Sequence, residues 1–247
     1  MALLEIHGLN KAFGGLQAVR DCSFHVEEGS ITALIGPNGA GKTTAFNLIS
    51  GVLRADSGRV IFRGEQIQHL PPHQITRRGM SRTFQISRNL EDLTVLENMI
   101  VQSPVHGWRG LLRRSMSAEE RDRAMELLEF VGIAKLAHAE TRDLSYGQKK
   151  LLDFASLLMS SPKLILLDEP AGGVNPALLE SIMERITELN EQRGITFLIV
   201  EHNMELVMRI SHSVVVMAYG SVIAQDAPDI VQNDPRVLQA YLGEVTL

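Results

Sequence analysis

A short glycine-rich stretch near the start of the chain has the residue types and spacing of a loop that binds phosphate. The sequence GPNGAGKT at residues 36–43 matches the pattern G-x-x-x-x-G-K-[ST], and it lies between an apolar run and a helical segment that ends near Ile49. Glycines in such a loop let successive backbone N–H groups surround phosphate oxygens. Lys42 would place a positive charge on the β- and γ-phosphates, and the hydroxyl of Thr43 would bind Mg²⁺. The predicted nucleotide-binding residues are Gly36, Pro37, Asn38, Gly39, Ala40, Gly41, Lys42, Thr43 and Thr44.

Two acidic residues and a histidine follow other apolar runs and are candidates for catalysis. Asp168 and Glu169 end the sequence LILLDEP, which has the composition of a buried strand. In an open α/β sheet, ligands bind beyond the carboxyl ends of the strands. Asp168 is therefore predicted to hold Mg²⁺, directly or through water, and Glu169 to orient and activate the attacking water. His202 follows the apolar run ITFLIV and is predicted at the same edge, where it would hydrogen-bond a γ-phosphate.

Three further features carry weaker signals. Gln85 ends the sequence SRTFQ, where the predicted sheet passes into helices, and it is a candidate for sensing Mg²⁺ or water. Phe13, in KAFGG, has two open interpretations, a ring that stacks on a base or a residue of the core. The basic stretch from Arg77 to Arg88 is interpreted as a solvated face, because a chain of acidic net charge with one short basic run is a poor candidate for nucleic-acid binding.

A second segment has the pattern of a helix start that suits an anion. In RDLSYGQKKLLDFASLL, which begins at Arg142, Ser145 and Gly147 precede an apolar-periodic run. The first N–H groups of a helix have no partner within the helix, so a helix start with small residues can bind an anion. The chain therefore has a second candidate anion site about a hundred residues after the phosphate loop.

The composition is ordinary for a globular protein. The chain has 247 residues, 45% of them hydrophobic, and a net charge of −5, which suits one large domain with a sizeable core. The single cysteine, Cys22, cannot form an internal disulfide, which fits a reducing compartment. The N-terminus lacks the pattern of a signal peptide, and no apolar run is long enough to cross a bilayer. We therefore expect that, if the protein acts at a membrane, it acts as a peripheral subunit.

The apolar segments predict an α/β fold with a mainly parallel sheet. Strands alternate with helices in the first and last parts of the chain, so the sheet should be covered on both faces. Residues 86–160 are helical in period without a strand signal, and we interpret them as a helical insertion. Strands are expected at 3–9, 18–29, 30–36, 58–67 as a pair around Gly64, 81–85, 163–170, 195–202, 213–220 and 221–226. Helices are expected at 42–49, 73–79, 94–101, 118–132, 147–160, 175–194, 204–211 and 234–245.

Taken together, these residues resemble those of the ATP-binding-cassette (ABC) ATPases, and the resemblance covers essentially the whole chain. GPNGAGKT looks like their Walker A loop, LILLDE their Walker B strand and LSYGQ their signature motif, which other phosphate-loop ATPases lack. By this resemblance Gln85 is the Q-loop glutamine, residues 172–176 are the D-loop, and His202 is the switch histidine. Phe13 lies where the family places the aromatic residue that stacks on adenine.

The resemblance implies a fold, a domain organisation and a set of site residues. The fold is that of a P-loop NTPase, a RecA-like, mainly parallel sheet flanked by helices, with an N-terminal antiparallel β part. The core comprises residues 1–85 and 161–247 of a single ABC ATPase domain, and residues 86–160 form an inserted helical subdomain that carries the signature motif. ATP and Mg²⁺ are the implied cofactors. The implied catalytic residues are Glu169, His202, Lys42 and Gln85, and the implied metal ligands are Thr43, Gln85 and Asp168.

Finer similarity points to one subfamily. FGGLQAV, RTFQ, LTVLENM, EHNMELVM and the ending AYLGEV look like segments of the ATPase subunits of branched-chain amino-acid importers. Three residues depart from the general family pattern: Tyr146 within the signature, Asn175 in the D-loop and Asn203 after the switch histidine. This similarity implies an ATPase that energises uptake of branched-chain or related amino acids from the cytoplasmic face of the cell (inner) membrane.

The family also suggests a use for the second anion site. Its cassettes pack head to tail, so that Ser145, Gly147 and Gln148 of one chain would bind the γ-phosphate held by Lys42 of the other. The implied partners are a second ABC ATPase subunit, identical or a paralogue, two transmembrane permease subunits and, indirectly, a solute-binding protein. Nucleic acid is not expected as a partner.

Three alternatives remain open from the sequence. The first is the ATPase of a lipid or lipopolysaccharide exporter, whose cassettes look much alike. The second is a non-transport ABC ATPase acting on DNA or ribosomes, although the single cassette and the lack of sustained heptads count against it. The third is a regulatory nucleotide-binding module without turnover, which the intact Lys42, Asp168, Glu169 and His202 disfavour.

Overall fold

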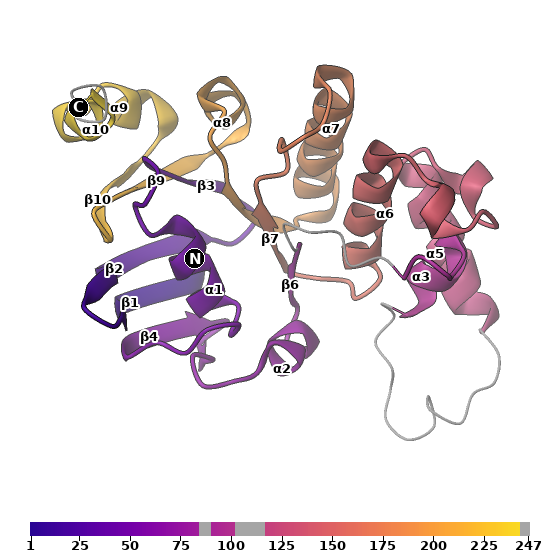
Figure 1. The fold of residues 1–247 in the computed structure, drawn as a ribbon, viewed down its shortest axis with the longest axis horizontal. Helices are drawn as coiled ribbons and strands as arrows, with labels where there is room; N and C mark the ends of the chain where they lie inside the picture. The colour runs from indigo at the N-terminus through magenta and orange to yellow at the C-terminus, as the bar shows by residue number, and fades with distance from the viewer. Residues whose placement is uncertain (84–89, 102–116, 243–247) are drawn as a thin grey trace.

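The computed structural model describes residues 1–83, 90–101 and 117–242 of the chain. Two sheets lie next to each other, and a group of helices forms the end of the molecule that is far from the smaller sheet (Figure 1). The α/β fold class predicted from the sequence is confirmed. In the parts of the chain that are described, no helix combines the length and the apolar character that crossing a membrane requires.

The larger sheet has six strands and is mostly parallel. Its strand order is β10-β9-β3-β8-β7-β6, with β10 antiparallel to β9 and the other pairs parallel. Every residue of β3, β7 and β8 is buried, which is what uninterrupted apolar runs predict for strands covered on both faces. The bounds are β3 Ile31–Ile35, β6 Met80–Arg82, β7 Leu164–Asp168, β8 Thr196–Val200, β9 Ser213–Ala218 and β10 Ser221–Asp226.

The smaller sheet is antiparallel, with strand order β2-β1-β4-β5. Its bounds are β1 Ala2–Phe13, β2 Leu16–Glu27, β4 Ser57–Phe62 and β5 Glu65–Gln66. The first strand is longer than the predicted 3–9, and the second starts and ends two residues before the predicted 18–29, because Phe13 pairs with Leu16 and the hairpin continues up to the turn between them. Gly14 in that turn has a φ of 59°, a conformation that glycine adopts without strain.

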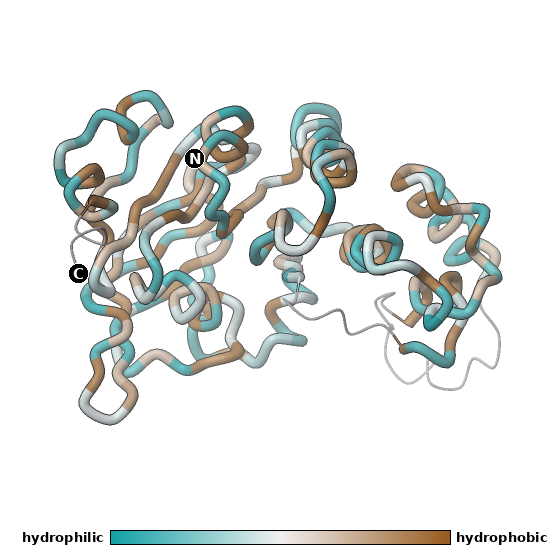
Figure 2. Tube along the Cα trace, turned by 45° about the horizontal axis from the view of Figure 1, so that its top comes forward, coloured by the Kyte–Doolittle hydropathy of each residue, from teal (hydrophilic) through white to brown (hydrophobic). Residues whose placement is uncertain are grey.

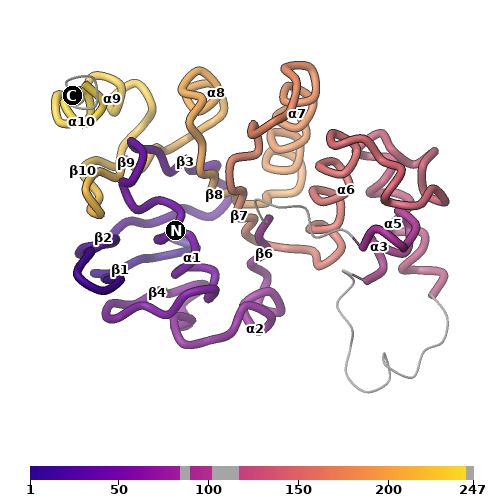
Figure 3. The backbone as a smooth tube through the Cα atoms, viewed as in Figure 1, coloured from indigo at the N-terminus to yellow at the C-terminus, as the bar shows by residue number. Residues whose placement is uncertain are grey.

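Helices cover both faces of the larger sheet and form the group at the end of the molecule (Figure 3). The helices against the sheet are α1 Lys42–Ile49, α2 Pro72–Arg77, α7 Pro176–Arg193, α8 Met204–Ile210, α9 Pro228–Gln232 and α10 Pro235–Leu242. The helices of the end group are α3 Val95–Val101, α5 Ala118–Phe130 and α6 Tyr146–Leu158, with short 3₁₀ turns at Ala134–Leu136 and Thr141–Asp143.

Alternate residues of the central strands face two different hydrophobic clusters. Leu164 and Leu166 of β7 pack in one cluster with α1 and the antiparallel sheet. Ile165 and Leu167 pack in the other with α7 and the end group. The alternation follows from the pleat of the strand, in which successive side chains point to opposite faces. Along the helices, hydrophobic residues are interspersed with hydrophilic ones (Figure 2).

One helix of the structure is absent from the sequence prediction, and two predicted elements are described only in part. The helix α9 was not predicted, since five residues are too few for a helical period to be visible. The last helix spans 235–242, and residues 243–245 of the predicted helix lie outside the described residues. The predicted strand 81–85 is β6 at residues 80–82, and residues 84 and 85 also lie outside the described part.

Candidate active site

The glycine-rich loop joins β3 to α1 in a conformation that larger residues would prevent. Gly36 has a φ of 146°, and a Cβ at this position would lie 2.0 Å from the carbonyl oxygen of Met217. Gly41 has a φ of 96°, and its Cβ would lie 2.4 Å from the carbonyl oxygen of Ala18. These two glycines therefore let the loop approach the backbones of β9 and β2.

The substitution Gly36→Ala should destabilise the protein by about 3 kcal/mol, because the new methyl group overpacks against a backbone that cannot move freely. Gly14→Ala is the matched control: its φ is 59°, and a Cβ at this position would have no heavy atom within 4 Å. That control should show only the conformational strain of about 1–2 kcal/mol. Urea denaturation measures both losses, and equal losses would contradict the contact argument.

Lys42, the first residue of α1, has its side chain folded back over the loop. Its ammonium Nζ donates hydrogen bonds to the carbonyl oxygens of Gly36 and Pro37, at 2.6 and 3.0 Å. The loop is also held from outside, because the N–H of Gly220 donates to the carbonyl of Ala40 at 3.1 Å. The positive charge of Lys42 is thus fixed at the mouth of the loop, where the sequence places phosphate oxygens.

A cavity of about 600 Å³ opens beside this loop and brings together residues from distant parts of the chain. Its wall consists of Phe13, Leu16, Gln17, Ala18, Asn38, Gly39, Ala40, Gly41, Lys42, Thr43, Thr44, Glu169, His202, Tyr219 and Gly220. Phe13 is 46% exposed, so its interpretation as a core residue is wrong. An aromatic ring and a phosphate loop in the same wall give the cavity the two features that a nucleotide needs.

Glu169 and His202 meet at the carboxyl end of the sheet, as the sequence predicts. Asp168 pairs with Val200 in the parallel strands β7 and β8, so the residues that follow these strands lie side by side. The Nε2 of His202 lies 2.8 Å from Oε1 of Glu169. Glu169 has a φ of 50°, a left-handed conformation that is strained for this residue type and common at active sites.

Asp168 is held by Arg82, whose side chain is nearly buried. Nη2 of Arg82 donates to Oδ2 of Asp168 at 2.9 Å, and Nη1 donates to Oδ1 of Asn47 at 2.6 Å and to Oγ of Ser50 at 2.7 Å. The guanidinium also lies over the ring of Phe46, 4.9 Å from its centroid. Burial lowers the pKa of Arg82, and the adjacent Asp168 opposes this shift. The interpretation of the basic stretch as a solvated face is therefore wrong for Arg82, whose side chain is only 10% exposed.

The residues beside the loop fit Mg²⁺ bound together with a nucleotide better than a metal bound by protein alone. Within the described ranges, no group of three or more His, Cys, Asp or Glu residues could hold a metal. Mg²⁺ at nucleotide sites commonly uses one or two protein oxygens, with phosphate and water completing its coordination. Thr43 lines the cavity and Asp168 lies at the end of β7, and the described wall does not include Asp168. The third predicted ligand, Gln85, lies outside the described residues.

The signature residues lie at the start of α6 and away from the cavity of their own chain. Ser145 caps this helix: its Oγ accepts from the N–H of Gln148 at 3.3 Å, and its own N–H donates to Oε1 of Gln148 at 2.8 Å. A Cβ at Gly147 would lie 2.7 Å from Cδ2 of Leu178, so glycine allows α6 to approach the start of α7. Of the residues that the structure describes, the cavity wall includes none of the three signature residues.

The departures from the family pattern have local structural roles. Tyr146 donates its hydroxyl to the carbonyl of Gly172 at 3.2 Å, which joins the signature helix to the D-loop of the same chain. Asn175 caps α7 by accepting from the N–H of Leu178 at 2.8 Å. Asn203 caps α8 by accepting from the N–H of Leu206 at 3.1 Å. Asparagine and aspartate are comparable at this position of a helix, so both asparagines preserve the caps.

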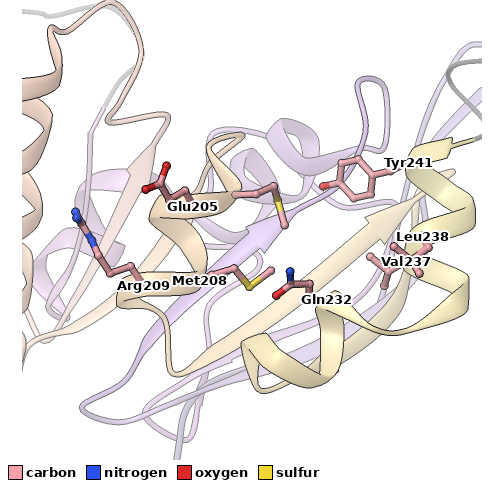
Figure 4. A pocket seen from close by; sticks show the side chains of 8 residues that line it. Glu205, Met208, Arg209, Gln232, Val237, Leu238 and Tyr241 are labelled. Carbon is pink, nitrogen blue, oxygen red and sulfur yellow. The ribbon is translucent and has the colours of Figure 1, made fainter.

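A second cavity lies away from the phosphate loop, between α8 and α10 (Figure 4). Its volume is about 620 Å³, similar to that of the first cavity. The wall is formed by Met204, Glu205, Met208, Arg209, Gln232, Val237, Leu238 and Tyr241. Because it carries neither a phosphate loop nor the Glu169–His202 pair, we assign the chemistry to the first cavity despite their similar sizes.

Sequence reasoning missed two residues near the site, besides Arg82. Tyr219 lines the cavity and is 83% exposed, and its position directly after the apolar run of β9 is a signal that could have identified it. Glu201 is buried directly before His202 and accepts hydrogen bonds from backbone N–H groups. No local pattern marks that role, since one of its donors comes from another loop.

A family model described as "ABC transporter" matches residues 19–172, which is more than half of the chain. The chain belongs to the ABC transporter family. A second model, described as "Branched-chain amino acid ATP-binding cassette transporter", matches residues 221–245 of this ABC protein. The short C-terminal match favours the importer over the exporter alternative.

Two curated relatives of this ABC protein match along nearly their whole length. It is 44% identical to the probable branched-chain amino acid transport ATP-binding protein LivG of Archaeoglobus fulgidus, over 98% of this chain and 96% of that protein. It is 38% identical to the high-affinity branched-chain amino acid transport ATP-binding protein BraF of Pseudomonas aeruginosa, over 98% of both chains. The chain is therefore an ABC transporter ATP-binding protein of the LivG/BraF subfamily.

Solved structures agree with this assignment. The ADP conformation of an ATP-binding cassette of an ABC transporter superposes with a TM-score of 0.87 at 35% identity, covering 98% of this chain and 99% of that one. A dimeric bacterial ABC transporter cassette superposes with a TM-score of 0.78 at 25% identity, covering 91% and 98%. Like its family, this ABC protein binds ATP and hydrolyses it to energise transport, and it is the ATP-binding subunit of a transporter of the branched-chain amino acid type.

Proposed function

We propose that this ATPase works as one half of a head-to-tail pair and energises the uptake of branched-chain or related amino acids. The observation that carries the pairing is the position of Ser145, Gly147 and Gln148, which lie outside the cavity wall of their own chain. A helix start that no nucleotide of the same chain reaches is available to the nucleotide of a partner. The dimeric arrangement of a structural neighbour supports such an assembly.

In this pair, Lys42 and the loop N–H groups stabilise the charge that develops on the γ-phosphate during in-line attack by water. Thr43 and Asp168 hold Mg²⁺, and Gln85 remains a predicted third ligand. When bound, Mg²⁺ supplies further positive charge to the phosphate oxygens. Because one oxygen of Asp168 is engaged by Arg82, the other oxygen is the one we assign to Mg²⁺, directly or through water.

Glu169 orients the attacking water and accepts its proton, while His202 holds the carboxylate and reaches the γ-phosphate. The contact of 2.8 Å between their side chains supports this division of roles. Both residues line the cavity together with the phosphate loop. Phe13, which lines the same cavity, is the proposed stacking partner of adenine.

The wider assembly follows the same proposal. The second ATPase subunit is a copy of this chain or a paralogue, and the pair serves two transmembrane permease subunits and, through them, a solute-binding protein. We place the ATPase peripherally at the cytoplasmic face of the cell (inner) membrane. Residues 1–85 and 161–247 form the proposed catalytic core, and residues 86–160 the proposed helical subdomain that passes motion to the permeases through Gln85.

Complementation between two inactive variants tests the shared site. Lys42→Ala removes the phosphate-binding charge, and Ser145→Arg blocks the signature helix, so each variant alone should lose turnover. In a mixed pair, the Lys42 of one chain and the Ser145 of the other still form one intact site. An equal mixture should recover roughly a quarter of wild-type ATPase activity if pairs form at random and each site works alone. A mixture no more active than its components would contradict the proposed pairing, and circular dichroism and the Tm of each variant control for folding.

A further inference from the structure

Glu201 is a buried carboxylate that joins two loops of the active site. It follows β8 directly and is only 3% exposed. Its Oε1 accepts from the N–H of Ala171 at 2.8 Å. Its Oε2 accepts from the N–H of His202 at 2.7 Å and from the N–H of Asn203 at 3.1 Å. One oxygen therefore binds the loop after β7, and the other binds the turn after β8.

Each of these loops carries one residue of the Glu169–His202 pair. Ala171 belongs to the tight turn in which the N–H of Gly172 donates to the carbonyl of Glu169 at 2.9 Å. A shift of Ala171 therefore moves Glu169. On the other side, Glu201 binds the backbone of His202 itself and of the residue that follows it. The Glu201 side chain therefore sets the separation of the two loops. The contact of 2.8 Å between Glu169 and His202 depends on this separation.

We propose that Glu201 is a positioning residue for ATP hydrolysis, which fixes Glu169 and His202 relative to each other without touching the nucleotide. The proposal rests on the roles proposed above for these two residues. All three donors are N–H groups, so the bridge needs an acceptor at both ends. Glutamine presents an NH₂ group on one side, where it would face another donor. Aspartate is one methylene shorter and reaches only one of the two loops.

A double-mutant cycle on the full-length chain tests this role. Glu201→Gln should lower kcat roughly tenfold to a hundredfold, the scale of a small misplacement of a catalytic group. The KM for ATP should change by less than about twofold, since the substitution leaves Lys42 and the phosphate loop unchanged. In the His202→Ala background, the same Glu201→Gln change should lower kcat by a clearly smaller factor than in the wild-type background, because residues that act through one another are not additive.

Two controls separate positioning from folding and from simple charge. Glu205→Gln removes a carboxylate on α8 that lines the second cavity, and it should leave kcat and KM unchanged. Affinity for ADP and the Tm report whether each variant is folded. If Glu201→Gln fails to fold, Glu201→Asp enters the same cycle in its place. Glu201→Asp should itself hydrolyse ATP slowly. Wild-type turnover in this variant would contradict the proposal that Glu201 joins the two loops.

The possible outcomes distinguish this inference from the proposed function. An unchanged kcat in folded Glu201→Gln, or the same fold-loss in both backgrounds, would overturn the positioning role alone. Wild-type turnover in His202→Ala would instead contradict the proposed catalytic role of His202, and the positioning role would fail with it. A loss of kcat that is larger in the background that retains His202 supports both the positioning role of Glu201 and the catalytic role of His202.

Discussion

Glu169→Gln should slow ATP turnover by about a hundredfold or more, the scale of losing one preorganised catalytic group. Glutamine has the size of glutamate and keeps an oxygen for the contact with His202, which lies 2.8 Å away. It cannot accept a proton from the attacking water. The binding of ATP should be preserved, because Lys42 and the loop are unchanged. The variant should therefore accumulate as an ATP-bound pair of cassettes.

Single-turnover hydrolysis and size-exclusion chromatography with and without ATP measure these two effects. Glu184→Gln on the exposed side of α7 is the matched control, and it should show wild-type turnover and no accumulated pair. Wild-type turnover in Glu169→Gln would remove Glu169 from its proposed role. Slow turnover without an ATP-dependent pair would leave Glu169 in place and contradict the shared site.

Arg82→Met should destabilise the fold by about 3 kcal/mol, because removing one partner of a buried ion pair leaves the other charge uncompensated. The side chains of Arg82 and Asp168 are 10% and 3% exposed, so water cannot replace the lost partner. The variant also loses the hydrogen bonds to Asn47 and Ser50. A loss of this size lowers the Tm of a chain of this length by roughly 6–12 °C.

Arg78→Met is the matched control. Arg78 lies four residues before Arg82 in the same basic stretch, and it forms an exposed ion pair with Glu65. Exposed ion pairs contribute little to the free energy of unfolding, so the Tm of Arg78→Met should change by no more than about 2 °C. Thermal unfolding followed by circular dichroism measures both variants. Similar shifts in the two would show that the Arg82–Asp168 contact is not the stabilising one.

The central part of the fold can be predicted because its segments are locally unambiguous. The uninterrupted apolar runs of β3, β7 and β8 have few alternatives to a strand covered on both faces. The helix α7 is equally clear, with Asn175 at its N-cap and Gly194 after its last residue. The helix α9 cannot be found in this way, since its start depends on Pro228 and its length does not complete a readable period.

The residues of the active site likewise fall into those that the sequence predicts and those that it does not. The loop, Glu169 and His202 each lie at the C-terminal end of a predicted strand, and the edge rule for parallel sheets brings them together. The partners of Arg82 are far from it in the chain: Asp168 is 86 positions away and Asn47 is 35 positions away. Glu201 likewise reaches Ala171 across 30 positions. Such contacts leave no periodicity, so the sequence shows these residues only as charges.

The hydroxyl of Tyr146 has a consequence for timing in the proposed pair. It contacts the carbonyl of Gly172 on the loop that follows Glu169, and it belongs to the helix that would serve the nucleotide of the partner. A rearrangement around one nucleotide is then transmitted, through a single side chain, to the helix that closes the other. Hydrolysis at one site would then change the rate at the other without being required for it, and the order of the two events becomes a property of the assembly.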